Sequence, residues 1–188
     1  MTISALDTKT ALLVIDLQKG IVGLPTAHPI AGVVANAVKL LEAFRRRSLP
    51  VVMINADGGA PGRTEQARPR VEMAAGWTEL VPELDRQPGD HAVTKRTWGA
   101  FTNTDLEHYL KEAGATQVVI AGVATGIGVE STARHAYELG FNVALAIDAM
   151  TDLSAEAHDR SVRLIFPRLG ETGTSQEIVD SLLGSSPT

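Results

Sequence analysis

Short continuous runs of apolar residues alternate along the chain with longer stretches in which apolar residues recur at helical spacing. The runs at 11–15, 51–55, 92–95, 118–122 and 143–147 predict strands. Continuous apolar runs of this length are typical of strands buried on both faces, as in parallel sheets. The helical spacing predicts helices over 33–44, 104–113, 129–139 and 154–165, and a last one from residue 174.

Local start and stop signals support these helices. Thr104 with Glu107, and Thr174 with Glu177, have the spacing of a capping box, in which two side chains satisfy backbone N–H groups at a helix start. Gly114 follows the second expected helix, where glycine commonly ends helices. The sequence therefore marks where two of these helices start and where one of them ends.

Strands that alternate with helices imply right-handed crossovers and an open, mostly parallel sheet. The stretch 57–89 is rich in Gly, Pro and charge, and we expect a long loop there. No repeat or interdomain linker interrupts the 188 residues, so we predict a single α/β domain over 1–188. Ligands of such sheets bind outside the carboxyl ends of the strands, which directs attention to the residues there.

Composition excludes several classes of function. The formal net charge of −5 argues against nucleic-acid binding, which requires a basic surface. The chain has no cysteine, which excludes disulfides, thiolate catalysis and Cys-ligated zinc. No apolar run approaches the ~20 residues of a membrane span, and no basic and apolar leader is present at the start. We therefore expect a cytoplasmic protein that contacts neither membrane nor nucleic acid.

Three features at the strand ends are candidates for chemistry. Asp16 closes the first strand and Lys95 closes the third, and the turn 122–132 joins a strand to a helix through Gly126 and Gly128. Glycine allows backbone to approach a ligand closely, and the start of the following helix suits an anion. Taken singly, an acid here could order a loop and a lysine could be solvated, so position alone leaves both roles open.

The blocks 10–18, 95–101 and 122–134 together resemble the isochorismatase-like hydrolases, also called the cysteine hydrolase superfamily. The resemblance extends from about residue 9 to residue 183. It implies a six-stranded parallel sheet in a three-layer α/β/α sandwich. It also implies that Asp16 and Lys95 face each other across the pocket and that the Val123–Ala124 peptide bond is cis. The family forms dimers or tetramers, so the resemblance implies a homodimer or homotetramer here.

The chain departs from the amidase branches of this family at one position. Those branches carry a cysteine nucleophile where this chain has Gly128, and true isochorismatases lack the thiol as well. Covalent acyl transfer at Gly128 is chemically impossible, and neighbouring Ser131 and Thr132 have no evident base. We therefore assign Asp16, Lys95 and Gly128 to the catalytic site and expect water to attack the substrate.

The expected function is noncovalent, Asp-assisted hydrolysis of a small metabolite that is anionic, an amide or an enol ether. The alternative is an amidase-type protein whose cysteine was replaced by Gly128, by natural loss or by engineering. Such a protein would be catalytically impaired and retained for small-molecule binding or for assembly. Retention of Asp16 and Lys95 favours the first hypothesis.

Further residues are assigned to substrate binding from their places in the three blocks. These are Gln18, Trp98, Phe101, Val123, Ala124, Thr125, Gly126 and Ile127. The region 55–59 contains no histidine, so the zinc site of related nicotinamidases is absent and neither metal nor cofactor is predicted. Among the histidines, His28 is the best placed to reach the pocket.

A dinucleotide-binding module is a third hypothesis for the same turn. The segment 126–131 partly matches G-x-G-x-x-G, and Asp148 ends the next expected strand. The third glycine is replaced by Ser131, and the motif lies in a late strand–helix unit, whereas the fingerprint occupies the first. Nucleotide binding is accordingly disfavoured.

Overall fold

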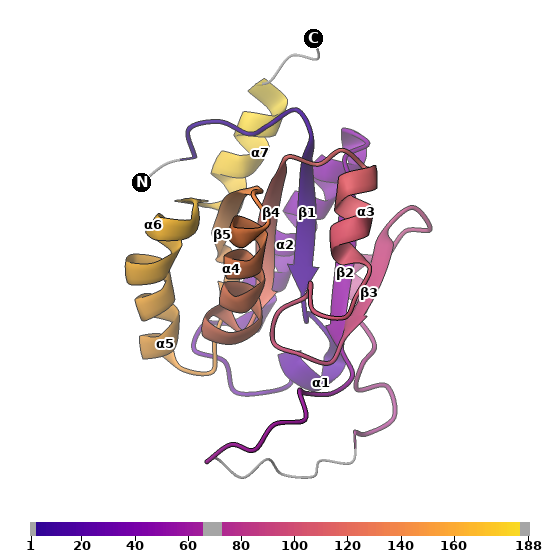
Figure 1. The fold of residues 1–188 in the computed structure, drawn as a ribbon, viewed down its shortest axis with the longest axis vertical. Coiled ribbons are helices and arrows are strands. Elements are labelled where there is room, and N and C mark those ends of the chain that lie inside the picture. Colours follow the sequence, from indigo (N-terminus) through magenta and orange to yellow (C-terminus); the bar gives the residue numbers. More distant parts are fainter. Residues whose placement is uncertain (1–2, 66–72, 185–188) are drawn as a thin grey trace.

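A central parallel sheet organises the molecule (Figure 1). The computed structural model describes residues 3–65 and 73–184. Its six strands lie in the order β3-β2-β1-β4-β5-β6, and every neighbouring pair is parallel. The strands are β1 (Thr10–Ile15), β2 (Val51–Ala56), β3 (His91–Lys95), β4 (Gln117–Val123), β5 (Asn142–Thr151) and β6 (Glu171–Gly173). The predicted α/β class and six-stranded parallel sheet are confirmed.

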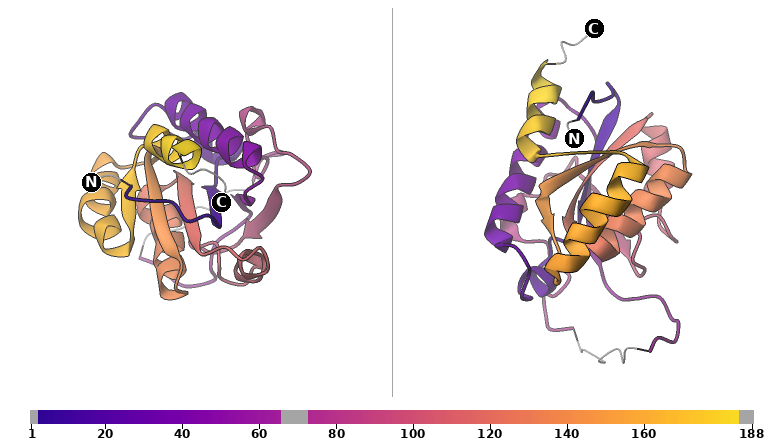
Figure 2. Two further views of the ribbon diagram at one scale, coloured as in Figure 1. Left: turned by 90° about the horizontal axis from the view of Figure 1, so that it is seen from above. Right: turned by 90° about the vertical axis from the view of Figure 1, so that its left-hand side faces the viewer.

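Helices cover both faces of the sheet, as the side view in Figure 2 shows. The helical elements are α1 (Lys19–Val22), α2 (Ile30–Arg46), η1 (Pro82–Leu84), α3 (Leu106–Glu112), η2 (Thr125–Val129), α4 (Glu130–Glu138), α5 (Ala155–Arg160), η3 (Ser161–Ile165), α6 (Phe166–Leu169) and α7 (Ser175–Gly184). Helices α2 and α7 pack on one face, and α3, α4 and α6 on the other. The result is the expected three-layer sandwich. No helix in the described part of the chain combines the length and the apolarity needed to cross a bilayer.

The central strand β1 shows why continuous apolar runs form this sheet. All six of its residues are buried. Successive side chains of a strand point to opposite faces. Leu12 and Val14 accordingly pack into the core beside α2, whereas Leu13 and Ile15 pack into the core beside α3 and α4. Because both faces of β1 are covered, its residues from Ala11 to Ile15 are all apolar.

The two predicted capping boxes have different outcomes. At Thr174 the backbone N–H donates to Glu177 Oε2 (2.7 Å) and the Glu177 N–H donates back to Thr174 Oγ1 (3.2 Å), so this box is confirmed. The box at Thr104 is wrong, because α3 begins one residue later and Asp105 occupies its N-cap. The Thr104 hydroxyl instead donates to the carbonyl of Ala100 (2.6 Å).

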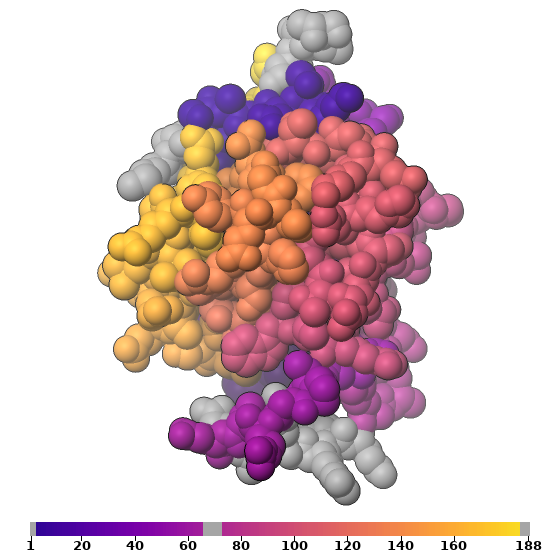
Figure 3. Space-filling view, in the orientation of Figure 1, coloured from indigo at the N-terminus to yellow at the C-terminus, as the bar shows by residue number. Residues whose placement is uncertain are grey.

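The loop between β2 and β3 contains little regular structure among its described residues. It holds the short helix η1 and an isolated antiparallel bridge between Gln18 and Leu80. Backbone bonds from Lys19 N to Glu79 O (2.8 Å) and from Gly20 N to Trp77 O (3.0 Å) attach it to α1. This part of the loop therefore lies at the carboxyl ends of the strands, the lower end of the molecule in Figures 1 and 3, whereas its last residues return to the start of β3, where Asp90 pairs with Arg45.

Candidate active site

Asp16 lies at the carboxyl end of the central strand, directly after β1. Its backbone adopts a left-handed conformation (φ 51°), which Asp tolerates better than most residues with a side chain. The Asp16 N–H remains bound to Ile54 O (2.9 Å), so the turn starts from an intact strand pairing. This turn places the carboxylate at the mouth of the sheet, where only 5% of the residue is exposed.

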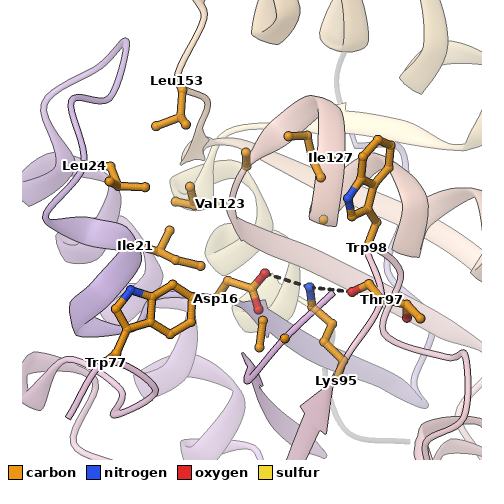
Figure 4. A pocket seen from close by; sticks show the side chains of 14 residues that line it. Asp16, Ile21, Leu24, Trp77, Lys95, Thr97, Trp98, Val123, Ile127 and Leu153 are labelled. Carbon is orange, nitrogen blue, oxygen red and sulfur yellow. Dashed lines mark hydrogen bonds and ion pairs between the residues drawn. The ribbon is translucent and has the colours of Figure 1, made fainter. Parts of the chain in front are cut away.

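Lys95 is the last residue of β3, and its side chain extends across the end of β2 to reach Asp16. Neighbouring strands are about 4.8 Å apart, so a long side chain is required to cross the intervening strand. Lys95 Nζ lies 2.8 Å from Asp16 Oδ2 and also donates to Thr97 O (3.3 Å). The structure thus brings the two predicted catalytic side chains together as a buried ion pair (Figure 4).

Burial dominates the electrostatics of Asp16. Desolvation raises its pKa to about 6, although the charge of Lys95 and its hydrogen bond lower it. The second carboxylate oxygen, Oδ1, is buried and has no hydrogen-bond partner among the described residues. An ionised carboxylate with one unsatisfied oxygen is costly in a low-dielectric site, which explains the direction of the shift.

The turn after β4 forms the third side of the site. The Val123–Ala124 peptide bond is cis, as the family resemblance implies. The chain then forms one π-helical turn, η2, which contains Gly128 and leads directly into α4. A Cβ atom on Gly128 would lie 3.3 Å from Asp16 Oδ2 and 3.2 Å from Ile15 Cγ2. Gly128 therefore lets the turn approach the acid more closely than a residue with a side chain would.

These groups border a pocket of about 220 Å³ at the carboxyl ends of the strands. Seven predicted site residues line it: Asp16, Lys95, Trp98, Val123, Ala124, Ile127 and Gly128. Five residues not assigned from the sequence line it too: Ile21, Leu24, Ala56, Gly58 and Leu153. The lining is completed by Trp77 and Thr97. The pocket is thus walled mainly by apolar side chains around one ion pair (Figure 4).

Two predicted substrate-binding side chains point elsewhere. The Gln18 amide donates to Ala56 O (3.0 Å) and accepts from Ala56 N (2.7 Å), so it joins the end of β2 to the segment after β1. Phe101 is buried against the ring of His135, at 5.2 Å between centroids. Neither residue is part of the pocket lining.

Thr125 and Gly126 also lie outside the lining, because their polar groups face α5 and the loop that precedes it. The Thr125 hydroxyl is within 2.8 Å of His158 Nδ1, and the Gly126 N–H donates to Asp152 Oδ2 (2.6 Å). Asp152 also accepts from the Leu153 N–H (2.7 Å). These contacts position the turn from its far side.

Trp77 belongs to the long loop of the same chain that contains the rest of the pocket. Its indole packs over Gly20, where a Cβ atom would lie 2.1 Å from the ring. Only glycine allows this approach. The apolar wall at Trp77, Ile21 and Leu24 comes from loop and short-helix residues whose periodicity carries no signal, so sequence patterns did not identify its aliphatic members.

His28 does not line the pocket. Its ring stacks at a tilt on His158, with 4.5 Å between centroids, and its Nδ1 lies 3.0 Å from Thr151 Oγ1. Burial and the neighbouring His28 lower the pKa of His158. Within residues 3–65 and 73–184, no group of three or more His, Asp or Glu side chains is arranged to hold a metal ion.

Similarity to known proteins agrees with this geometry. Residues 10–177 match the isochorismatase domain family. The chain is 44% identical over 181 residues to the isochorismatase family protein YwoC of Bacillus subtilis, covering 93% of this chain and 94% of that protein. It is 32% identical to the ureidoacrylate amidohydrolase RutB of Pseudomonas syringae, covering 73% and 69% of the two chains.

A solved structure shows the same fold at high similarity. An isochorismatase family protein from Burkholderia thailandensis superposes with a TM-score of 0.93 and 40% sequence identity, over 97% of this chain and 100% of the other. Fold, site geometry and sequence similarity therefore agree, and the chain belongs to the isochorismatase family of hydrolases.

Proposed function

We propose that the protein hydrolyses a small amide or enol ether without a covalent intermediate, using water activated at Asp16. One observation carries this proposal: Asp16 Oδ2, paired with Lys95, lies 3.3 Å from the Cβ position that Gly128 leaves empty. Asp16 and Gly128 both line the pocket of about 220 Å³, which has room for a water molecule next to the acid. A substrate held in the pocket then meets that water at the carboxyl end of the sheet.

The hydroxyl groups near the site support water as the nucleophile. Thr132 Oγ1 donates to Gly128 O (2.7 Å) and accepts from Ala100 N (3.1 Å), so its proton is already committed. Thr97 lines the pocket, but its hydroxyl donates to Gly99 O (2.8 Å). Neither hydroxyl is next to a base that could activate it, as a nucleophilic alcohol requires.

The amide reaction begins with ionised Asp16 accepting a proton from water while the water oxygen bonds to the carbonyl carbon. The carbonyl electron pair moves onto its oxygen, where the Lys95 ammonium and the positive end of the continuous helix η2–α4 offset the charge. Collapse of the tetrahedral intermediate breaks the C–N bond, and Asp16 returns the proton to the leaving amine. An enol ether would instead take a proton from neutral Asp16 at carbon before water adds.

The relationship to an amidohydrolase favours amides as the first substrates to test. The experiment is a screen of small amides, including nicotinamide and maleamate, and of isochorismate, followed by a single turnover in ¹⁸O-labelled water. Noncovalent hydrolysis puts one labelled oxygen into the product of the first turnover. An unlabelled first product, with the label left in Asp16 and passed to product only in later turnovers, would show acyl transfer to the carboxylate and contradict the proposal.

A second candidate function is ligand binding by a catalytically impaired protein. It is favoured by Gly128, which stands where the amidases of the superfamily carry their nucleophile. Asp16→Asn separates the two functions. An active enzyme loses its turnover with this substitution, whereas a binding protein has no turnover to lose and keeps its ligand affinity within a few fold.

A further inference from the structure

The charge balance of the pocket determines which molecules it can hold. Among the described residues that line it, the only ionisable side chains are Asp16 and Lys95, which neutralise each other at 2.8 Å. We propose that the pocket selects an uncharged molecule with a compact apolar body and one polar group, and rejects the corresponding anion. This inference rests on the proposed function, because it names the substrate class of the same site.

An anion would find no free cation in the described lining. Lys95 is engaged by Asp16 and by the carbonyl of Thr97, which leaves one of its three N–H groups. The adjacent Arg96 lies outside the lining and binds Asp57 through two hydrogen bonds of 2.9 Å each. A bound carboxylate would therefore be stripped of water beside the like charge of Asp16, which is costly without a countercharge.

The remaining N–H of Lys95 suits a neutral acceptor. The carbonyl oxygen of an amide, or an ether oxygen, can accept this single hydrogen bond without bringing a charge into the pocket. Recognition of a carboxylate usually uses a bidentate fork such as a free guanidinium. Lys95 offers one charged donor to the ligand where a fork would offer two.

The rim of the pocket supplies the surface for an apolar body. The described residues include eight large hydrophobic side chains that are exposed, and four of them line this pocket. Their exposed fractions are Leu24 44%, Ile127 38%, Leu153 50% and Trp98 63%. Apolar side chains gathered at the mouth of a cavity are characteristic of a ligand site, and a bound apolar group would remove them from water.

The volume limits the size of that body. An apolar cavity of about 150 Å³ holds a benzene molecule. The pocket of about 220 Å³ therefore accommodates a ring or a branched aliphatic group together with a small polar head. Its walls lie on opposite sides in Figure 4, with Trp77 and Ile21 on one side and Trp98 and Ile127 on the other.

The chain provides its own reporter of occupancy. It has two tryptophans, Trp77 and Trp98, and both line the pocket. Tryptophan fluorescence of the full-length protein at pH 8 would be titrated with three amides, namely benzamide, isovaleramide and cyclohexanecarboxamide, and with the three matching carboxylates. Each pair differs in charge and hardly in shape. We expect each amide to bind at least about tenfold more tightly than its acid. Equal or tighter binding of the acids, or no response to any amide, would overturn the proposal.

A pair of variants tests whether the missing cation is the cause of the selectivity. Leu153→Arg places a guanidinium on the rim of the pocket, and Leu164→Arg makes the same change at an exposed leucine outside the lining. We expect Leu153→Arg to strengthen benzoate binding at least about tenfold and Leu164→Arg to leave it unchanged. Unchanged benzoate binding in a folded Leu153→Arg protein would contradict the charge argument.

The experiments distinguish a failure of the proposed ligand class from a failure of the proposed hydrolysis. Amides that bind with this selectivity but are not hydrolysed would leave the ligand class standing and refute the hydrolysis. Hydrolysis of carboxylate-bearing amides in preference to uncharged ones would support the hydrolysis and refute the ligand class.

Discussion

Asp16 and Lys95 are buried to 5% and 3% exposure, and Asp16 Oδ2 and Lys95 Nζ are 2.8 Å apart. The pair joins the ends of two strands that are not neighbours in the sheet, since β2 lies between β1 and β3. Burial raises the pKa of Asp16 to about 6 in spite of the ammonium group. A carboxylate with this pKa changes its protonation state within one unit of neutrality, as a general acid–base group must.

The dependence of kcat/KM on pH tests the role of Asp16. If Asp16 acts as a base it must be ionised, so activity is lost as the pH falls through about 6. Below that pH, kcat/KM should fall about tenfold per unit. An acid role predicts the opposite sign, with activity lost as the pH rises through the same value. A rate profile from pH 4.5 to 8 measured on an amide substrate distinguishes the two.

Removal of the partner charge should move this profile. Lys95 lowers the pKa of Asp16, so Lys95→Met should shift the acidic limb to a higher pH. We also expect kcat to fall by about tenfold or more, because the charge opposite the developing oxyanion is lost. Lys111→Met is the control, since that lysine forms an exposed pair with Glu107 on α3. A limb that stays in place would show that the ion pair does not control Asp16.

Substitution at Gly128 tests the open space beside the acid. Gly128→Ala places a methyl group 3.3 Å from Asp16 Oδ2, where we propose that water binds, and should lower kcat about tenfold or more. Gly32→Ala is the matched control, because a Cβ there meets no atom within 4 Å. Full activity in Gly128→Ala would exclude water at this position.

The related substitution Gly128→Cys places a thiol next to Asp16, which can act as its base. We expect the variant to react with iodoacetamide and to form an acyl adduct with an amide substrate, both detectable by intact-protein mass spectrometry. The wild-type chain has no cysteine and provides a blank for both measurements. Absence of any thiol reactivity in the folded variant would show that Asp16 does not activate a group at this position.

Asp152 should contribute to stability by positioning the turn that contains Gly128. Its carboxylate accepts from the N–H groups of Gly126 (2.6 Å) and Leu153 (2.7 Å), and the residue is 3% exposed. Asp152→Ala leaves these donors unpaired and should lower the free energy of unfolding by about 1–3 kcal/mol. Urea denaturation measures the loss, and Asp159→Ala on the exposed side of α5 is the control, with little effect expected.

Substitution of Gln18 tests whether this residue stabilises the fold or binds the substrate. Its amide is fully buried and bonds to both backbone groups of Ala56. Gln18→Ala should therefore lower the free energy of unfolding by about 2–3 kcal/mol, whereas exposed Gln176→Ala should not. If Gln18 has no direct role at the substrate, KM per folded molecule stays within about twofold. A much higher KM would support the sequence-based assignment to substrate binding.

The sheet was predictable because strands that are covered on both faces are apolar along most of their length. β1, β2, β4 and the first part of β5 are buried on both faces and so appear as continuous apolar runs. The three-residue strand β6 was not predicted from residue patterns, because Glu171–Gly173 is too short and too polar to produce such a run. Its existence depends on pairing with β5, which is a tertiary contact.

The site was predictable where chemistry coincides with a strand end, as at Asp16 and Lys95. The prediction was less accurate where the direction of a side chain determines whether the residue lines the pocket. Thr125 and Ile127 belong to the same π-helical turn, yet Thr125 faces His158 and Ile127 faces the pocket. Leu153 and Leu24 lie in separate loops that meet only in the folded molecule. No local periodicity distinguishes them from other surface leucines.

The balanced ion pair has a consequence for turnover. Hydrolysis of an uncharged amide makes a carboxylate, and the described lining holds no spare cation to receive it beside Asp16. The reaction thus converts a molecule that the pocket favours into one that it repels. Product inhibition would then be weak, and the carboxylate would leave the site readily after each turnover.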